Sequence, residues 1–307
     1  MIQNVLQLEL IMVLLALMGV WLRRRDIITD QGRDCLTDVL MILVLPCNIF
    51  LSFRVGADLK TLQSFLITIA ISVFVMLLTA VLGKVLYRHR DARQEKVFRY
   101  GLVNSNALFI GLPVIQSLLG DAGVLQVTMY MIFVRMFCWS YGLSLYTGVK
   151  SDWKTSAKRL LTNPCMLAAA LGLAAMLAGA ELPAFLDRTL EYVSDCLMTI
   201  SMLLIGVVLS EMDVKQVFRR DVWSFTALRL LGIPMIVFLL CRGLEVPYII
   251  TAACTLLSGM PAASLTAVLA ASYHGDAELG ALIVAVSTIL SAVTVPLWFL
   301  VLQTAGP

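Results

Sequence analysis

Charged residues are scarce in this chain of 307 residues. Asp, Glu, Lys and Arg make up 14% of it, hydrophobic residues make up 60%, and the mean hydropathy is +0.91. This hydropathy lies far above the average for soluble domains, and a single large core would not need it. The composition therefore argues against a soluble protein, and we expect no nucleic-acid partner.

Histidines and patterned cysteines are also few. The two histidines, His89 and His274, fall in expected loops, and no HExxH motif is present. The seven cysteines are odd in number and lack CxxC or metal-ligand spacing, so we interpret them as small core residues. A histidine-ligated metal centre and an intramembrane enzyme are therefore not expected, and neither is a cofactor.

Acidic residues are missing from the middles of the apolar segments. Glu9, Asp38 and Asp195 lie near segment ends. Cation antiporters typically depend on a deep carboxylate that exchanges a proton for a cation near neutral pH. The pattern argues against a Na⁺ or H⁺ antiporter, which stays open as the alternative function, and leaves H⁺ and Na⁺ as candidate coupling ions.

What the chain does have is a series of apolar segments near 20 residues long, the length that crosses roughly 30 Å of hydrocarbon. The first segment ends in Arg23, Arg24 and Arg25 with no small-residue cleavage site, so we expect a retained span and not a signal peptide. We predict an all-α polytopic membrane protein with ten transmembrane helices, at residues 4–22, 36–53, 62–87, 98–119, 124–147, 161–179, 193–211, 222–242, 247–273 and 277–303.

The basic residues between these segments predict their direction. Seventeen of the 23 Lys and Arg residues fall in the odd-numbered connections and four in the even-numbered ones, while Arg135 and Arg229 fall inside spans. Cytoplasmic connections carry the excess of Lys and Arg. We expect a multi-pass protein of the cell (inner) membrane with both termini extracytoplasmic.

The chain divides into two halves of five helices each, residues 1–150 and 151–307, at the basic connection between residues 150 and 159. An odd number of spans per half inverts the second half relative to the first. The tripeptide Gly-Asp-Ala closes the fourth span at 120–122 and the ninth at 275–277, an offset of 155 residues. We therefore predict inverted five-helix repeats.

The fourth span of each half contains residues that break a helix. The first carries NSNALFIGLPVIQ at residues 104–116, with Gly111 and Pro113, and the second carries Gly259 and Pro261. An unpaired backbone group in hydrocarbon costs several kcal/mol, so an interruption persists only where protein or a water-filled cavity satisfies it. One such segment alone is more simply a kinked packing helix. Two in matching positions favour a transporter binding site.

Broken helices that cross near the middle of the membrane would bring four half-helix ends together. The N-terminal ends attract an anion, and their amides are free to donate. We expect Asn104, Ser105 and Asn106 to solvate a substrate and the freed backbone, and Gly111 and Pro113 to create the opening.

At these residues the chain resembles the auxin efflux carrier family of the bile acid, arsenite and riboflavin transporter superfamily. That family contains plant auxin exporters and bacterial permeases for malate, malonate and similar acids. The resemblance covers nearly the whole chain, through the segments GVWLRRRDIITDQG, LPCNIFLSF, NALFIGLP, RLLGIP and MPAASLTAVLAASYHGDAELGALIVAVSTILSAVTVP. The short connection between the halves is similar to the compact bacterial type.

The resemblance implies crossed fourth and ninth helices, a scaffold of helices 1, 2, 6 and 7, and an elevator-like transport domain of helices 3–5 and 8–10. It also implies a homodimer through the scaffold. Asn106, Pro113 and Pro261 carry over as residues that line the substrate site, and Arg229 as the basic residue of the eighth helix. Arg135 departs from the family, whose bacterial members often have an acidic or amide residue in the fifth helix.

Two arginines and one asparagine complete the candidate site. Arg135 lies about 17 Å from either end of its span, so we hypothesise that it binds a substrate carboxylate, with backbone carbonyls of a broken helix as the alternative partner. Arg229 lies nearer the cytoplasmic end, where it either snorkels as an anchor or attracts the anion. Asn48 either faces the site or packs. The polar residues of the last two spans, Ser287 among them, more often serve helix packing.

The leading hypothesis is a secondary transporter of small organic anions, mono- or dicarboxylates, embedded in the lipid bilayer. A channel would need the same path, and saturable flux with counterflow separates the two. The expected substrate-binding residues are Asn48, Asn104, Asn106, Gly111, Pro113, Arg135, Arg229, Ser258, Gly259 and Pro261.

Overall fold

A computed structural model describes residues 2–54, 59–147, 164–180, 182–210, 219–273 and 275–304. Most of these residues are helical, and one isolated bridge, between Ser105 and Ala262, occurs among them. The chain forms two compact units. Unit 1 comprises Met1–Leu66, Leu108–Met129 and Lys158–Glu211, and unit 2 comprises Ile67–Ala107, Tyr130–Ala157 and Met212–Pro307. The predicted boundary between the halves, the Lys150–Arg159 connection and His274 lie outside the described residues.

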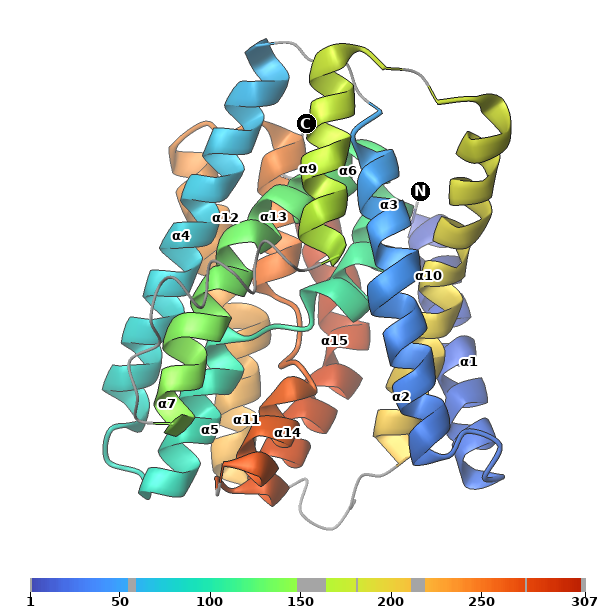
Figure 1. Ribbon diagram of the computed structural model, residues 1–307. Coiled ribbons are helices and arrows are strands. Elements are labelled where there is room, and N and C mark those ends of the chain that lie inside the picture. Colours follow the sequence, from blue (N-terminus) through green and yellow to red (C-terminus); the bar gives the residue numbers. More distant parts are fainter. Residues whose placement is uncertain are drawn as a thin grey trace. The chain divides into compact units, whose positions relative to one another are not determined.

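Unit 1 is a set of long apolar helices (Figure 1). Its helices are α1 (Ile2–Arg24), the continuous run of α2 (Asp30–Val39), η1 (Leu40–Val44) and α3 (Leu45–Ser52), α9 (Pro164–Ala178) and α10 (Ala184–Ser210), joined by the first part of α6 (Leu112–Phe137).

Two glycines allow α1 and α10 to approach closely. A Cβ added to Gly206 would lie 2.0 Å from the Ala16 carbonyl oxygen, and one added to Gly19 would lie 2.2 Å from the Leu203 oxygen. Small residues at such contacts let membrane helices bring their backbones together. The sequence thus specifies this helix pair through two glycines, which have no side chain at the contact.

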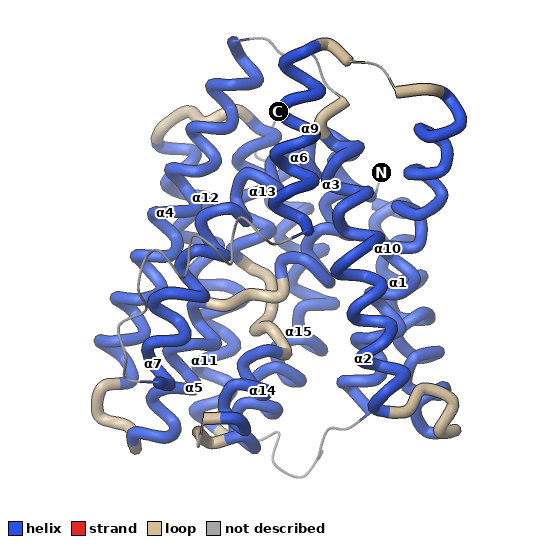
Figure 2. The backbone as a smooth tube through the Cα atoms, viewed as in Figure 1, coloured by secondary structure: helices blue, strands red, loops and turns tan. Residues whose placement is uncertain are grey.

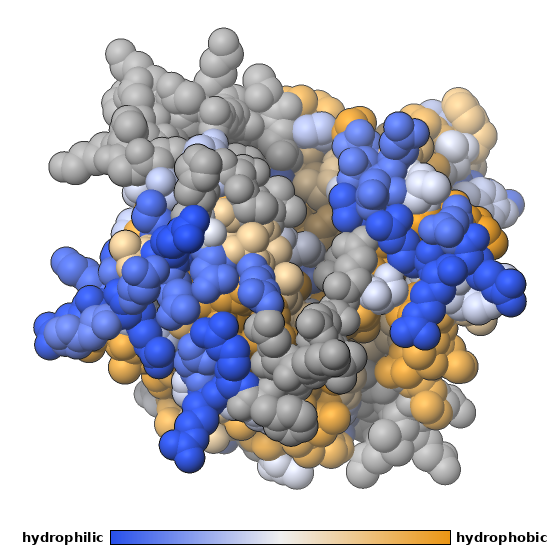
Figure 3. Space-filling model, turned by 90° about the horizontal axis from the view of Figure 1, so that it is seen from below, coloured by the Kyte–Doolittle hydropathy of each residue, from blue (hydrophilic) through white to orange (hydrophobic). Residues whose placement is uncertain are grey.

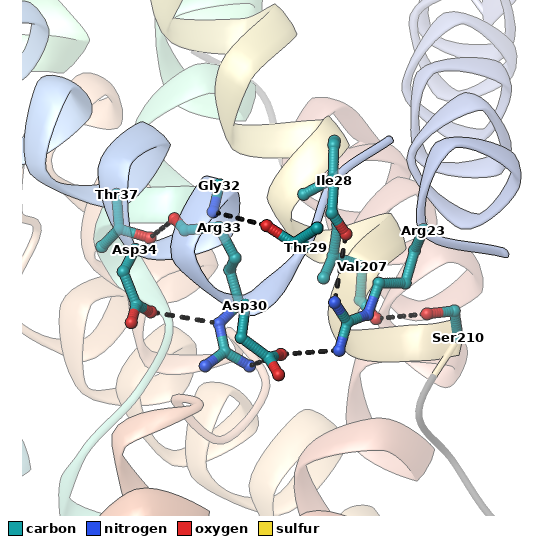
Figure 4. Close-up of polar contacts among 10 residues, drawn as sticks. All are labelled: Arg23, Ile28, Thr29, Asp30, Gly32, Arg33, Asp34, Thr37, Val207 and Ser210. Atoms are coloured by element: carbon teal, nitrogen blue, oxygen red, sulfur yellow. Dashed lines mark hydrogen bonds and ion pairs between the residues drawn. The ribbon is translucent and has the colours of Figure 1, made fainter. Parts of the chain in front are cut away.

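The connection between α1 and α2 is held by side chains of both helices (Figure 4). Arg23 donates to the Ile28 carbonyl at 3.1 Å and pairs with Asp30 at 2.6 Å, while the Thr29 hydroxyl caps α2 by accepting from the Gly32 amide. The C-terminal end of α10 lies beside that of α1 in the same view. This is the arrangement required if the first and seventh predicted spans cross in the same direction.

Unit 2 holds the remaining helices. They are most of α4 (Leu59–Tyr87), α5 (Ala92–Val103), the end of α6, η3 (Cys138–Gly142), α7 (Leu143–Thr147), α11 (Arg220–Ala227), η5 (Leu228–Gly232), α12 (Ile233–Gly243), α13 (Tyr248–Ser258), α14 (Leu265–Ser272) and α15 (Ala277–Thr304). In this unit α15 packs against α5, α11, α13 and α14.

The end of unit 2 where α4 meets α5 is polar, and Figure 3 shows hydrophilic residues in blue from this side. Asp91 caps α5 by accepting from the Arg93 amide, and Asp221 pairs with Arg219 at 2.9 Å and with Arg90 at 3.7 Å. The hydrogen bond to Asp221 raises the pKa of Arg219, which stays charged at physiological pH.

Each of three π-helical segments ends two residues before a proline. They are η1 before Pro46, η2 (Ala107–Gly111) before Pro113, and η5 before Pro234. Proline lacks an amide hydrogen and clashes with the carbonyl four residues earlier, so the helix widens there. The expectation that Gly111 and Pro113 open the fourth span is therefore wrong, because the chain stays helical at both.

Six helical stretches of the described chain are long and apolar enough to cross a membrane. They are Asp30–Leu51, Leu62–Tyr87, Ala107–Arg135, Ala184–Val207, Arg220–Gly243 and Ala277–Thr304, and α9 and α13 are shorter apolar helices. Ten spans and the inverted repeat stay predictions. Three expected starts differ: the helix expected from residue 36 begins at Asp30, the one expected from residue 98 begins at Ala92, and the one expected from residue 193 begins at Ala184.

Candidate functional site

Two helix breaks meet inside unit 2. Residues 104–106 interrupt the chain between α5 and η2, and residues 259–264 interrupt it between α13 and α14. We call these two segments the crossover. They appear as tan loops between helices in Figure 2. The Asn106 amide donates to the Pro261 carbonyl at 2.7 Å, and the Ala263 amide donates to the Asn104 carbonyl at 3.0 Å. Each break therefore satisfies part of the backbone freed by the other.

Arg229 binds the freed carbonyls at the two helix ends. Its Nε donates to the Met260 carbonyl at 2.9 Å, and one terminal nitrogen donates to the Leu102 carbonyl, also at 2.9 Å. The residue is 1% exposed. The alternative that Arg229 snorkels is wrong, because the side chain is buried. Its charge complements the negative ends of α5 and α13. Its guanidinium fork reaches both breaks at once.

Ser287 on α15 satisfies a third backbone group of the crossover. The Ala262 amide donates to the Ser287 hydroxyl at 3.1 Å, and that hydroxyl donates in turn to the Ile283 carbonyl at 2.6 Å. A buried amide without such a partner would cost a large part of its desolvation energy. The sequence places Ser287 in a packing stripe but does not reveal this partner.

The two asparagines of the first break have different surroundings. The Asn104 amide group donates to the Tyr100 hydroxyl at 3.0 Å, and its oxygen accepts from the Cys138 thiol at 3.6 Å. The side chains of Asn106 and Ser105 are buried, but neither makes a hydrogen bond within the described chain. The Asn104 side chain thus hydrogen-bonds within the protein, whereas the side chains of Ser105 and Asn106 can still bond a ligand.

Arg135 belongs to the same unit, one helical turn before Cys138. The Cys138 thiol donates to the Asn104 side-chain oxygen at 3.6 Å. One terminal nitrogen of Arg135 is buried without a hydrogen-bond partner, and no ion pair to this residue occurs in the described chain. The alternative expectation, that Arg135 binds backbone carbonyls, finds no such contact among these residues.

Negative charge stays away from the crossover in the described part of unit 2. The acidic residues there lie in connections or in the first turn of a helix: Asp91, Glu95, Asp221, Glu245, Asp276 and Glu278. The charge bound at the crossover is therefore that of the buried Arg229 guanidinium, which makes the local field positive.

The remaining candidate residues divide between packing positions and unit 1. Ser258 borders the second break, and its hydroxyl donates to the Thr255 carbonyl at 2.8 Å. A Cβ on Gly259 would lie 3.2 Å from the Pro234 ring, so this glycine permits close packing. Asn48, Gly111 and Pro113 belong to unit 1, whereas the crossover residues belong to unit 2.

Asn48 is the centre of a buried polar cluster in unit 1. Its nitrogen donates to the Gln116 side-chain oxygen at 3.1 Å and to the Ser194 hydroxyl at 2.8 Å, and its own oxygen is buried without a partner. Gln116 and Ser194 carry no signal in the sequence, because single polar residues in apolar helices are usually packing residues.

Apolar helices of membrane-spanning length, with two interrupted helices paired at a buried cationic crossover, define the class: an integral membrane protein with a polar centre. The sequence matches the membrane transport protein family over residues 2–158 and 153–299, and the chain belongs to this family. This confirms the family resemblance. The protein is thus a member of a membrane transporter family.

Two relatives extend over nearly the same length. The chain is 24% identical to an uncharacterized transporter of Methanocaldococcus jannaschii, over 94% of this chain and 96% of the relative. It is 27% identical to an uncharacterized transporter of Methanothermobacter thermautotrophicus, over 94% of this chain and 95% of that relative.

Proposed function

We propose that the protein is a secondary transporter that moves small organic anions across the cell membrane by alternating access. The observation that supports this most is the crossover itself, where the buried Arg229 bonds to both helix breaks and the described acidic residues lie elsewhere. Membership in the membrane transport protein family supports the general activity.

The chemistry of Arg135 favours a carboxylate as the transported group. A buried guanidinium nitrogen without a partner is costly in a membrane, and an anion that binds there removes the cost. Guanidinium and carboxylate match in a two-pronged hydrogen-bonded pair. Ser105 and Asn106 supply uncharged hydrogen-bonding groups at the crossover.

The proposed mechanism is an elevator-like motion. Predicted spans 3–5 and 8–10 move against a dimeric scaffold of predicted spans 1, 2, 6 and 7. The freed backbone groups of the crossover bond to each other, to Arg229 and to Ser287. The crossover can therefore move as a rigid body, because these hydrogen bonds stay formed during the motion. Extracytoplasmic termini and the homodimer belong to this proposal.

A cation-coupled antiporter of related fold is the second candidate. It would need a titratable carboxylate at the crossover, and the described residues of unit 2 place their acids at helix starts and connections. The anion transporter therefore has the better support.

The test is uptake into proteoliposomes of labelled malate, malonate, succinate, lactate and indole acetate, with proton and sodium gradients imposed separately. The proposal expects saturable uptake of at least one acid, with counterflow when unlabelled acid is loaded inside. Proton or sodium exchange without movement of any acid would instead support the antiporter.

A further inference from the structure

We propose that the C-terminal end of α4 binds the headgroup of an anionic phospholipid through Lys84 and Arg88. The proposal concerns the surface of the protein that meets the bilayer, so it does not depend on which substrate is transported. It follows from the place, the neighbours and the free donors of these two cations.

Lys84 and Arg88 lie at the end of a membrane-spanning stretch. The apolar part of α4 that is long enough to cross a membrane covers Leu62–Tyr87. Lys84 lies in the last turn of this helix, and Arg88 directly follows it. Both side chains are exposed and long enough to extend to the level of the headgroup phosphates. This end of α4 is the one expected in the cytoplasm, where the membrane leaflet carries anionic lipids.

The two cations share a face of α4 with apolar side chains that the protein leaves uncovered. Leu77 is 53% exposed, Val81 59% and Val85 57%. Residues four apart are neighbours on a helix, so these three form a stripe that ends beside Lys84 and Arg88. An acyl chain can pack along the stripe. The two cations lie about 6 Å apart along the axis, near enough to bind one phosphate group.

Lys84 and Arg88 have no acidic partner in the described chain. Lys84 makes no hydrogen bond or ion pair there, and Arg88 donates from Nε to the His89 ring at 2.8 Å, so its terminal nitrogens keep their donors. Carboxylates at this end of unit 2 have other partners. Glu95 pairs with Arg99, Asp221 pairs with Arg219 and Arg90, and Asp91 and Asp276 accept from backbone amides as helix caps.

A phospholipid fits this surface better than a soluble anion. Two exposed cations hold a soluble anion weakly, because water and salt screen their charge. A phospholipid adds the contact of its chains with the apolar stripe, and the bilayer confines its headgroup to the level of the cations. Attraction of two cations to a negatively charged headgroup should favour an anionic over a zwitterionic lipid by about 10-fold or more.

Native mass spectrometry of the purified protein in detergent measures this preference. The protein is titrated with phosphatidylglycerol or with phosphatidylcholine of identical acyl chains. We expect the first phosphatidylglycerol to bind about 10-fold more tightly than phosphatidylcholine. An excess of inorganic phosphate or glycerol phosphate, which have the charge without the chains, should not displace it.

Three variants test the assignment to α4. The double variant Lys84→Gln and Arg88→Gln should reduce the difference between the two lipids to less than about 2-fold, whereas the charge-conserving double variant Lys84→Arg and Arg88→Lys should keep it. Arg242→Gln at the exposed end of α12 is the control and should behave as wild type. Size-exclusion profiles establish that the variants are folded.

Each outcome decides one claim. Equal affinity of the wild-type protein for the two lipids would show that it does not recognise the negative headgroup, and the proposal fails. A preference that survives in the double Gln variant would place the lipid elsewhere than on α4. Displacement by inorganic phosphate or glycerol phosphate would show a site for soluble anions instead of a lipid. None of these outcomes bears on the transported acid, which the uptake experiment tests separately.

Discussion

At the scale of residues, two arginines in one membrane region have different roles. Arg229 is held by two backbone carbonyls, whereas Arg135 has an unpaired buried nitrogen. The sequence predicted that both were unusual, because charge inside a span is expensive. It could not say which was engaged, since the partners of Arg229 are main-chain groups that every residue carries.

Replacing Arg229 should destabilise the fold. Arg229→Gln leaves the Leu102 and Met260 carbonyls without their charged donor, at about 1–3 kcal/mol for each. Arg229→Lys should recover only part of the loss, because one ammonium group lacks the fork that reaches both oxygens. Thermal unfolding in detergent measures the effect. Stability equal to that of Arg242→Gln in both variants would show that Arg229 does not hold the crossover.

The two asparagines of the first break should separate stability from transport. Asn104→Ala removes hydrogen bonds with Tyr100 and Cys138 and should lower the unfolding free energy by about 1–2 kcal/mol. Asn106→Ala removes a side chain with no partner in the described chain, so its stability should change little while KM for the transported anion rises about 10-fold. The reverse pattern, with Asn106 stabilising and Asn104 affecting only KM, would contradict these roles.

At the scale of elements, prolines and glycines decide where helices widen, break and approach. The sequence predicted a break in the fourth and the ninth segment, and both are interrupted. It misplaced the first, because Pro113 follows a π-helical segment that absorbs the missing hydrogen bond, while the interruption falls at residues 104–106. Composition alone does not distinguish a widened helix from a broken one.

The contact between α1 and α10 should be sensitive to a single methyl group. Gly206→Ala would put a Cβ 2.0 Å from the Ala16 oxygen, so the helices must separate, at about 1–3 kcal/mol. Gly243→Ala is the matched control, since nothing lies within 4 Å of its added Cβ and it should be neutral or slightly stabilising. Equal melting temperatures for the two variants would mean that α1 and α10 do not pack as described.

At the scale of the whole molecule, membrane insertion and family could be predicted from hydropathy and segment order. The number of spans and their direction rest on Lys and Arg counts, which the helices themselves do not test. Contacts within unit 1, such as the cluster around Asn48, could not be predicted, because residues far apart in the chain meet there.

Labelling by a membrane-impermeant thiol reagent checks the predicted direction. His89→Cys lies in the connection after α4, expected in the cytoplasm, and Arg242→Cys lies at the end of α12, expected outside. In intact cells we expect modification at position 242 alone, and at both positions after permeabilisation, read by peptide mass spectrometry. Modification at position 89 in intact cells would show that the predicted topology is inverted.

The central claim is that an organic anion binds at the crossover, and substrate protection tests it most directly. Ser105→Cys places a thiol at the first break with little change in volume, and its alkylation by a membrane-permeant reagent is followed by mass spectrometry. Saturating lactate should slow this alkylation about 10-fold or more, whereas uncharged lactamide should not. An alkylation rate that is the same with lactate, succinamate, succinate, malate or no acid would contradict the claim.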